Sequence, residues 1–585
     1  MNTPSTTSPR LQTSALVVTC LVALALGFAA SCSSDDAGVA SNNVGTGGAA
    51  TGGAGGAGGA GGATGGTGGG SGGLPTSFSD FPKDPILVDT GLPADLPTQF
   101  AAPGQTTGGP CLYEPSLGAL VPRNWTPLSF EWTPAPDQNI FELRLSVKNQ
   151  VNDLVVYTSQ SSYVIDATLW TALTKNSGGE DVKVTLRGAK LDGTTLSAGP
   201  ATGADGLLHL APVAAPGSVV YWTSGAPGSG ATALKGFTIG DTKVTTVLTP
   251  PVVGGDTNCI ACHASAPDGA FTFYVRDGNS SASRSVDVRS VDGKGTAPPA
   301  SVVTPTALAL LGRHKQSAPA LTIAHYSPTD AVALTVFQEP TLTANKSELA
   351  WTDLLTTDPN TGWGIVARTG DNGQVASPTW WHDGSTIAYT SAPVASEGVI
   401  TRVTDADPHM DIYTVPYNNK QGGNATPLPG ASEPGFWEYY PVISPGDELL
   451  AFNRCAPRKE ANGSWANSYN QTTGEVYVVP AKGGTATRLA ANDPPACAGK
   501  VSPGLTNSWP RWAPTAEAFG GKNYYWVVFS STRRADNNPQ LFISGVVTDA
   551  TGAIETTYPA LYVTAQVAEE NNHTPAWDFF QVVPR

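Results

Sequence analysis

Apolar and polar residues alternate with a period of two along much of the chain after residue 110. The alternation is clearest in the segments LSFEWTPAP, IFELRLSV and DVKVTLRGA, which start at Leu128, Ile140 and Asp181. A period of two buries one face of a strand and leaves the other in water. No long segment shows the period of an amphipathic helix. The pattern predicts an all-β fold that begins with a small β-sandwich over residues 111–212.

The segment 217–585 contains an internal repeat in which an apolar strand, a turn rich in Pro, Asp and Gly, and a second apolar strand follow one another. Copies start at Cys262 (CHASAPDGAFTFYVRD), Ala318 (APALTIAHYSPTDAVALTVF), Ser377 (SPTWWHDGSTIAYTS), Tyr440 (YPVISPGDELLAFNR) and Ser508 (SWPRWAPTAEAFGGKNYYWVVFSSTR). The spacing of roughly 55–70 residues is within reach of a propeller blade with insertions.

A sixth copy is split between the two ends of this segment. HTPAWD, from His573, supplies a first strand at the end of the chain, and VVYWTS, ALKGFTI and KVTTVL, from Val219, Ala233 and Lys243, supply the others. Pairing of C-terminal with N-terminal strands closes a ring and removes its free edges. The repeat therefore predicts a six-bladed β-propeller closed in this way.

The repeat resembles that of TolB-type propellers, in which the turn reads S-P-D-G. Residues 267–269 (PDG) match this turn best, and residues 382–384 (HDG) and 445–447 (PGD) are drifted copies. The stretch PRNWTPLSFEWTPAP, from Pro122, resembles the first sheet of a fibronectin type III or immunoglobulin-like module. The resemblances imply a binding or interaction platform preceded by a spacer or binding unit.

The N-terminus has the features of an export signal. A polar start with Arg10 precedes an apolar run from Ala15 to Phe28, and Ala-Ala-Ser stands directly before Cys32. This order predicts a lipoprotein signal peptide over residues 1–31 and an acylated Cys32, with ordinary signal cleavage as the alternative. Residues 32–110 are rich in Gly, Ala, Thr and then Pro, which predicts a disordered tether. We expect an exported protein, lipid-anchored to the outer membrane or the cell surface, with the periplasmic side also open.

Composition narrows the function classes. The net charge is −15, and Lys and Arg never cluster, so a nucleic-acid partner is excluded. The expected partner is an envelope or extracellular protein or a glycan, and the only expected membrane contact is the lipid anchor. A formal G-x-S-x-G at residues 69–73 lies in a glycine tract, without the strand and helix that a nucleophile elbow needs. Zinc-protease and phosphate-loop signatures are absent, which argues against an enzyme. A glycan-active hydrolase, with carboxylates contributed by distant blades, is the second alternative.

The pentapeptide CIACH at residues 259–263 is the strongest chemical motif. C-x-x-C-H is a c-type haem attachment pattern, in which Cys259 and Cys262 bind the vinyl groups and His263 is the proximal iron ligand. The first alternative function is therefore that of an extracytoplasmic electron-transfer protein that carries haem c. Candidate distal ligands are His573, His314 and, third, Met410.

Alignment on the turns places the motif in the fold. His263 stands where other copies have Pro378, Pro441 and Pro510, with Pro319 and Pro575 in a similar place. The first strand of a blade lines the channel of a propeller. The alignment therefore predicts that the pentapeptide lies where a channel-lining strand begins.

Two other hypotheses compete for the same residues. In one, Cys259 and Cys262 form a local disulfide and His263 only packs. In the other, four residues bind a divalent metal: His263, His314, Glu438 and His573. Elsewhere, Cys455 and Cys497 are predicted to form a disulfide, which leaves Cys111 buried and free or paired in another way.

Overall fold

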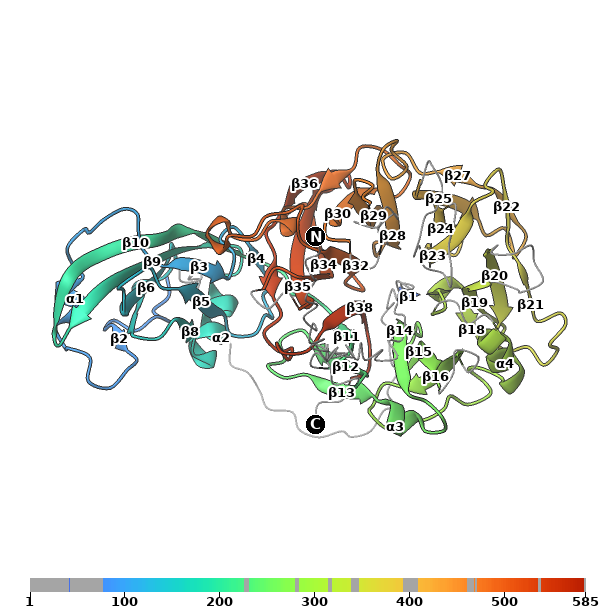
Figure 1. The fold of residues 1–585 in the computed structure, drawn as a ribbon, viewed down its shortest axis with the longest axis horizontal. Helices are drawn as coiled ribbons and strands as arrows, with labels where there is room; N and C mark the ends of the chain where they lie inside the picture. Colours follow the sequence, from blue (N-terminus) through green and yellow to red (C-terminus); the bar gives the residue numbers. More distant parts are fainter. Residues whose placement is uncertain are drawn as a thin grey trace, which may run out of the picture.

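The computed structural model describes residues 41–42, 77–225, 231–278, 284–313, 318–337, 347–392, 409–459, 468, 471–534 and 538–582. Strands dominate these residues, which confirms the all-β prediction. Figure 1 shows a β-sandwich on the left and a set of sheets arranged around a common centre on the right. Cys32 and His314 lie outside the described residues.

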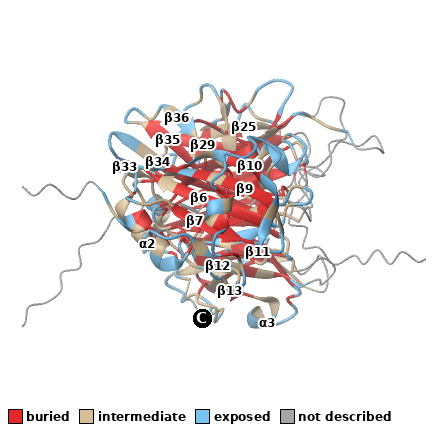
Figure 2. Ribbon diagram, turned by 90° about the vertical axis from the view of Figure 1, so that its left-hand side faces the viewer, coloured by how far each residue is buried: buried red, intermediate tan, exposed pale blue. Residues whose placement is uncertain are grey.

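The sandwich consists of two sheets. One has the strand order β2-β7-β6-β9-β10-β4, and the other has the order β3-β5-β8. The first comprises β2 (Ile86–Leu87), β7 (Leu154–Thr158), β6 (Ile140–Val147), β9 (Asp181–Asp192), β10 (Thr195–Leu210) and β4 (Leu120–Val121). The second comprises β3 (Cys111–Glu114), β5 (Ser129–Thr133) and β8 (Ser162–Val164). The alternation seen in the sequence is real in β5, where Phe130 and Trp132 are buried between less buried neighbours. Figure 2 looks onto this part and shows the buried residues along β6, β7 and β9.

Residues 77–110 contain buried side chains and regular structure, so the predicted disordered tether is wrong from residue 77 onward. Phe81, Leu96 and Phe100 are buried. Strand β2 pairs in parallel with β7, and helix α1 (Leu96–Gln99) with the residue after it supplies two of these side chains. Phe81 joins the main core of the sandwich, whereas Leu96 and Phe100 form a separate apolar cluster with residues of β6, β7 and β9. Composition alone does not reveal these contacts, because apolar residues are sparse in this stretch.

The remaining strands form successive antiparallel sheets in chain order. Their bounds are β11 (Ser218–Thr223), β12 (Ala233–Thr238) and β13 (Thr245–Leu248); β14 (Cys259–Ser265), β15 (Phe271–Asp277) and β16 (Ser285–Ser290); β18 (Tyr326–Ser327), β19 (Asp330–Phe337), β20 (Glu348–Asp353) and β21 (Trp363–Ile365); β23 (Gln374–Trp380), β24 (Thr386–Ala392), β25 (Asp411–Pro416) and β27 (Thr426–Pro427); β28 (Trp437–Ile443), β29 (Leu449–Cys455), β30 (Glu475–Pro480) and β31 (Thr487–Arg488); and β32 (Asn507–Trp512), β34 (Lys522–Ser531), β35 (Gln540–Asp549) and β36 (Ile554–Thr557). Such sheets around a centre are the architecture of a β-propeller.

Smaller elements complete the molecule. They are helices α2 (Ala167–Asn176), α3 (Pro250–Val253) and α4 (Pro305–Arg313), and strands β1 (Ser41–Asn42), β17 (Leu321–Thr322), β22 (Ala367–Thr369), β26 (Gly422–Asn424), β33 (Glu517–Phe519) and β37 (Leu561–Tyr562). Short 3₁₀ turns lie at Ile323–His325, Ala490–Asn492 and Ala496–Ala498. None of the helices described is long and apolar enough to cross a membrane.

The last strand of the chain joins the first sheet of the ring. Strand β38 (Asn572–Asp578) pairs antiparallel with β11, with Val219 opposite Trp577 and Trp222 opposite His573. The two ends of the segment 217–585 are therefore held in one sheet. The predicted pairing of C-terminal with N-terminal strands is confirmed.

The turns of the repeat have a common geometry. The amide of Gly269 donates to the carbonyl of Ala266 at 2.8 Å, and the amide of Gly384 donates to that of Trp381 at 3.0 Å. Asp447 makes the corresponding bond to Ser444 at 3.0 Å. Gly269 has a positive φ of 69°, and a Cβ there would lie 2.0 Å from the carbonyl oxygen of Phe579, so glycine is required.

The sandwich and the ring share one hydrophobic core. Phe130 and Leu186 of the sandwich belong to the same cluster as Tyr221, Trp526 and other residues of the first and last sheets of the ring. The indole of Trp526 also donates to the carbonyl of Ala214, in the segment that connects the two parts, at 3.2 Å. The two parts are therefore not independent modules on a flexible linker.

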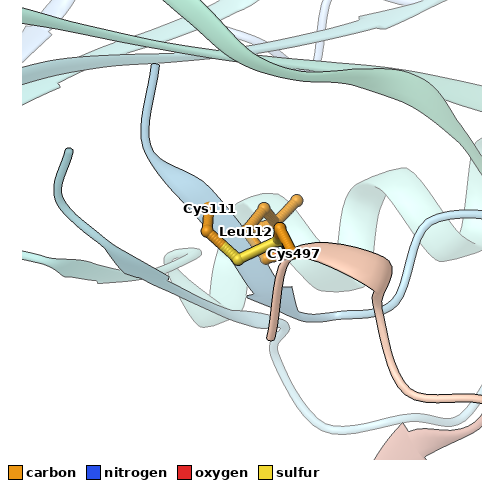
Figure 3. Close-up of a disulfide and its surroundings, with 3 residues drawn as sticks. All are labelled: Cys111, Leu112 and Cys497. Carbon is orange, nitrogen blue, oxygen red and sulfur yellow. Dashed lines mark hydrogen bonds between the residues drawn. A yellow bond between two sulfur atoms is a disulfide. The ribbon is translucent and has the colours of Figure 1, made fainter. Parts of the chain in front are cut away.

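A disulfide links the same two parts (Figure 3). Cys111 of β3 is bonded to Cys497, in the turn Ala496–Ala498, across 386 residues of sequence. The predicted Cys455–Cys497 bridge is wrong, because Cys455 is a buried free thiol at the end of β29. Burial raises the pKa of this thiol to about 12. The loop after β31 carries Cys497 away from Cys455 and onto the sandwich.

Replacing Cys497 with Ser should lower the thermal stability, because the disulfide restricts a very long loop in the unfolded chain. In the chain-entropy picture this restriction is worth up to about 5 kcal/mol. Thermal unfolding without reductant measures the loss, and C455A serves as the control that removes a thiol but no bridge. Peptide mapping should recover a Cys111–Cys497 linked peptide, and a Cys455–Cys497 peptide would contradict this connectivity.

Candidate functional site

The inner strands of five sheets share a β-bulge. One extra residue interrupts the register of β14 at Cys262, and equivalent breaks occur in β23, β28, β32 and β38. In the last four strands the bulge contains a proline: Pro378, Pro441, Pro510 and Pro575. Proline has no amide hydrogen to give to the ladder, so it is tolerated at a bulge. The structure thus confirms that His263 occupies the position that these prolines mark.

The residue before each of these prolines has a left-handed backbone. The φ angles are 46° at Ser377, 58° at Tyr440, 55° at Trp509 and 45° at Thr574. Non-glycine residues rarely adopt this conformation, and it is concentrated at functional sites. Four repeats of the same strained bulge define a ring of residues at one level around the centre, which we call the bulge ring. Figure 1 shows the strands that carry it toward the middle of the sheets.

Aromatic side chains connect the bulge ring across three sheets. The ring of Tyr440 stacks on Trp509 with centroids 6.0 Å apart, and Trp509 stacks on His573 at 5.1 Å. His573 then meets the edge of Trp222 at 4.5 Å. The indole of Trp222 donates to the carbonyl of Ile260, inside the CIACH pentapeptide. A continuous aromatic chain therefore leads from β28 to the predicted haem motif.

The pentapeptide forms the first part of β14, and every residue of that strand is buried. The Nε2 atom of His263 lies 2.9 Å from the carbonyl oxygen of Val220 on β11, so in the neutral ring Nε2 carries the hydrogen and donates it. The Nδ1 atom of His263 is buried and makes no hydrogen bond. Burial lowers the pKa of His263 to about 4 and that of His573 to about 3, so both rings are neutral at pH 7.

Arg511 is a buried charged residue directly after the bulge of β32. It follows Pro510 in β32, is only 3 % exposed, and its Nη1 donates to the carbonyl of Pro510 at 2.7 Å. Within the described part of the chain no carboxylate forms an ion pair with it. Burial lowers its pKa to about 10, whereas Tyr440 and Cys262, on two other sheets, raise it. The guanidinium is therefore a buried cation in the space between β28 and β14.

The other predicted ligands are not gathered around His263. Glu438 is bound to Arg454 at 3.0 Å, and burial raises its pKa to about 7. Met410 packs in a cluster with Trp437 and Cys455. No three His, Cys, Asp or Glu side chains of the described residues lie close enough together to hold a metal ion, so His263, Glu438 and His573 do not form a metal site. His314 lies outside the described residues.

The pentapeptide in this structure does not fit a covalent haem. Nε2 of His263, the atom that would bind the haem iron, is occupied by the carbonyl of Val220, and every residue of β14 is buried. Cys262 carries a thiol, so the alternative disulfide between Cys259 and Cys262 is not formed either. Haem c stays a prediction from the sequence motif.

The sequence alignment identified the equivalent proline positions, but it predicted no bulge and missed Arg511, Trp222 and the aromatic chain. The proline alignment located the bulges because a missing amide hydrogen is visible in the sequence. Arg511 sits one residue after such a proline, in the string SWPRW. A charged residue inside a fully buried inner strand was the signal that could have drawn attention to it.

Comparisons with known proteins give a general likeness. No protein-family model and no curated protein matches the chain. Among solved structures, TolB from Acinetobacter baumannii is 14 % identical over 71 % of this chain and 85 % of its own, with a TM-score of 0.35. Kuenenia stuttgartiensis hydrazine synthase is 11 % identical over 62 % and 46 %, with a TM-score of 0.35. The β-propeller domain of the trilobed protease from Pyrococcus furiosus is 9 % identical over 67 % and 94 %, with a TM-score of 0.26. At these scores the likeness carries no argument about the site, and the fold rests on the sheets described above.

Expression of the full chain together with a cytochrome c maturation system should give a protein without covalent haem. The carbonyl of Val220 holds Nε2 of His263, the atom that would bind the haem iron, and the strand that carries both cysteines is buried. Absorption after denaturation and acid–acetone extraction makes the measurement, and a C259A variant is the matched control. A Soret band that survives extraction in the unaltered protein and is lost in C259A would contradict this expectation.

The two buried histidines should make the protein less stable in acid. Their pKa values are lower in the folded than in the unfolded chain, so the unfolded chain binds more protons below pH 6.5. Stability should fall as the pH drops from about 6.5, by up to about 1.4 kcal/mol per pH unit for each histidine, and level off near pH 4 for His263 and pH 3 for His573. H573F keeps the aromatic chain and should reduce the slope in denaturant unfolding between pH 4 and 6.5. An unchanged slope in H573F would contradict the neutral buried ring.

Proposed function

We propose that this protein is an envelope-tethered binding protein whose sheets are the blades of a six-bladed, TolB-like propeller. It holds a carboxylate of its partner at the bulge ring. The partner is an extracellular or envelope protein segment. A lipid on Cys32 and the Gly-rich stretch after it would hold the propeller at the outer membrane or cell surface.

The observation that carries the proposal is the unbalanced charge of Arg511. A charge buried without a counter-ion costs several kcal/mol. Folded proteins retain such a cost when a ligand supplies the missing charge. A guanidinium offers two parallel N–H donors that match a carboxylate. An anionic partner therefore explains why an arginine stands in an otherwise uncharged inner strand.

Two hydroxyl groups of the bulge ring support the same proposal. The Oγ of Ser377 and the Oγ1 of Thr574 are buried and make no hydrogen bond in this structure. They occupy equivalent positions on β23 and β38, at the level of the bulge before Arg511. Buried polar groups are almost always hydrogen-bonded, so both are suited to a ligand's oxygen atoms. Tyr440 and Trp509, at the bulges of β28 and β32, contribute stacked aromatic rings to the same bulge ring.

The groups at this place favour binding rather than chemistry. Nε2 of His263 contacts a backbone carbonyl and the ring of His573 stacks on Trp509, which are packing contacts rather than those of a Ser-His-Asp arrangement. A ring of hydroxyls, aromatic faces and one cation has the groups of a recognition site.

Replacing Arg511 with Met should abolish binding without harming the fold. Loss of a buried, unbalanced charge should leave the free protein as stable as before or raise its stability by about 1–4 kcal/mol. Binding of a peptide set with free or amidated C-termini, and of an acidic oligosaccharide, can be measured by calorimetry. Affinity for free carboxylates should fall at least tenfold in R511M.

The exposed Arg123 gives the matched control, because R123M removes the same charge from the surface. A large loss of stability in R511M would show a structural arginine and overturn the proposal. Equal binding of free and amidated peptides by the unaltered protein would overturn it as well. Binding of the oligosaccharide alone would replace the protein partner with a glycan.

A further inference from the structure

A cavity lies where the sandwich meets the ring of sheets. Its volume is about 230 Å³, and we call it the junction pocket. Strand β3 forms one wall through Tyr113 and Glu114, and the residues after β34 form another through Arg533 and Arg534. Lys500, from the loop that carries Cys497, also lines the cavity. The disulfide between Cys111 and Cys497 holds two of these walls together.

Positive groups dominate the junction pocket. The Nε of Arg533 donates to Ser531 at 2.9 Å, and its Nη2 donates to the carbonyl of Ala491 at 2.6 Å. Arg534 forms an ion pair with Glu131 at 3.2 Å. The net charge of the chain is −15, so two adjacent arginines and a lysine around one cavity are an unusual concentration of cations.

Each of the two lining arginines has one donor atom without an acceptor. The Nη1 atoms of Arg533 and Arg534 are buried and make no hydrogen bond. Arg533 is only 8 % exposed, and its guanidinium lies over the ring of Phe542, another lining residue, at 4.6 Å. Buried donors without acceptors are costly, and here two of them belong to residues that line the same cavity.

The acidic side chain in this pocket does not cancel the positive charge. Glu114 is only 5 % exposed, and its Oε1 accepts from the amide of Tyr562 at 3.0 Å. Burial raises its pKa to about 8, with Glu131 also raising it and Arg533 and Arg534 lowering it. The carboxyl is therefore mostly protonated at pH 7 and adds no full negative charge there.

We propose that the junction pocket binds a small oxyanion, with the Nη1 atoms of Arg533 and Arg534 as its donors. The volume lies below the roughly 300 Å³ at which pockets for drug-sized ligands begin, so the ligand is a free anion or a small group on a larger molecule. Arginine forks match tetrahedral oxyanions such as sulfate and phosphate groups. The site is independent of Arg511 and of the function proposed above.

The test is calorimetric titration of the full chain with sulfate, at a constant ionic strength set by chloride. Sulfate should bind more tightly than chloride, and R534Q should weaken its binding at least tenfold while R123Q leaves it unchanged. Equal affinity for sulfate and chloride, or equal losses in R534Q and R123Q, would overturn the proposal. Titration with inorganic phosphate and with glycerol phosphate then distinguishes a free anion from a phosphate ester.

The pH dependence gives a second readout that a purely structural arginine would not produce. As the pH rises through 8, Glu114 gains a negative charge and sulfate affinity should fall, while sulfate itself does not titrate. The groups facing Glu114 are Glu131, Tyr113, Arg533 and Arg534. Burial and Glu131 raise the pKa of Tyr113, and burial lowers that of Arg533 to about 10, so the decline is measured between about pH 7 and 9. E114Q should bind sulfate as the unaltered protein does at pH 6.5 and lose the decline above pH 8. If R534Q does not fold, this profile decides, and an unchanged decline in E114Q overturns the proposal.

Discussion

The pairing of β38 with β11 is the constraint on which the rest of the structure depends. It joins the last strand to the first sheet of the ring, so neither presents a free edge at that place. It also brings His573 opposite Trp222, and through Trp222 onto the CIACH pentapeptide. The same first sheet shares its core with the sandwich, through Tyr221 and Trp577. Removing the last few strand residues would therefore disturb the ring, the aromatic chain and the junction with the sandwich together.

The repeat, the turns and the ring closure could be predicted from the sequence because each depends on local chemistry. Gly269 reports a backbone that only glycine adopts easily, and Pro441 or Pro510 reports a missing amide hydrogen. The HTPAWD segment predicts a strand with no neighbouring strand close to it in the sequence. At the start of the segment 217–585, three predicted strands lack the first strand of their copy. These glycine, proline and strand patterns remain recognisable although the sequences of the copies differ.

Other features depend on contacts between distant segments, and the sequence does not reveal those. Strand positions in the repeat pair Cys497 with Cys455, but the excursion after β31 carries Cys497 to Cys111. Phe81 and Phe100 resemble parts of a tether because their burial depends on the sandwich, not on their neighbours. The haem motif is recognised as an isolated pentapeptide, whereas β14 gives its histidine a carbonyl partner on β11. The surroundings of Arg511 depend on contacts among three sheets. The junction pocket forms only where the sandwich meets the ring of sheets.

The disulfide between Cys111 and Cys497 has a consequence for proteolysis. The bond makes the chain between these residues a covalent circle that includes most of the sandwich and most of the ring. A protease that cuts one exposed loop inside this circle opens it but releases no fragment. Two cuts are needed before a piece can leave, and non-covalent sheet pairing still holds that piece. In a compartment with many proteases and few chaperones, a molecule cut once in this loop stays covalently linked through the disulfide.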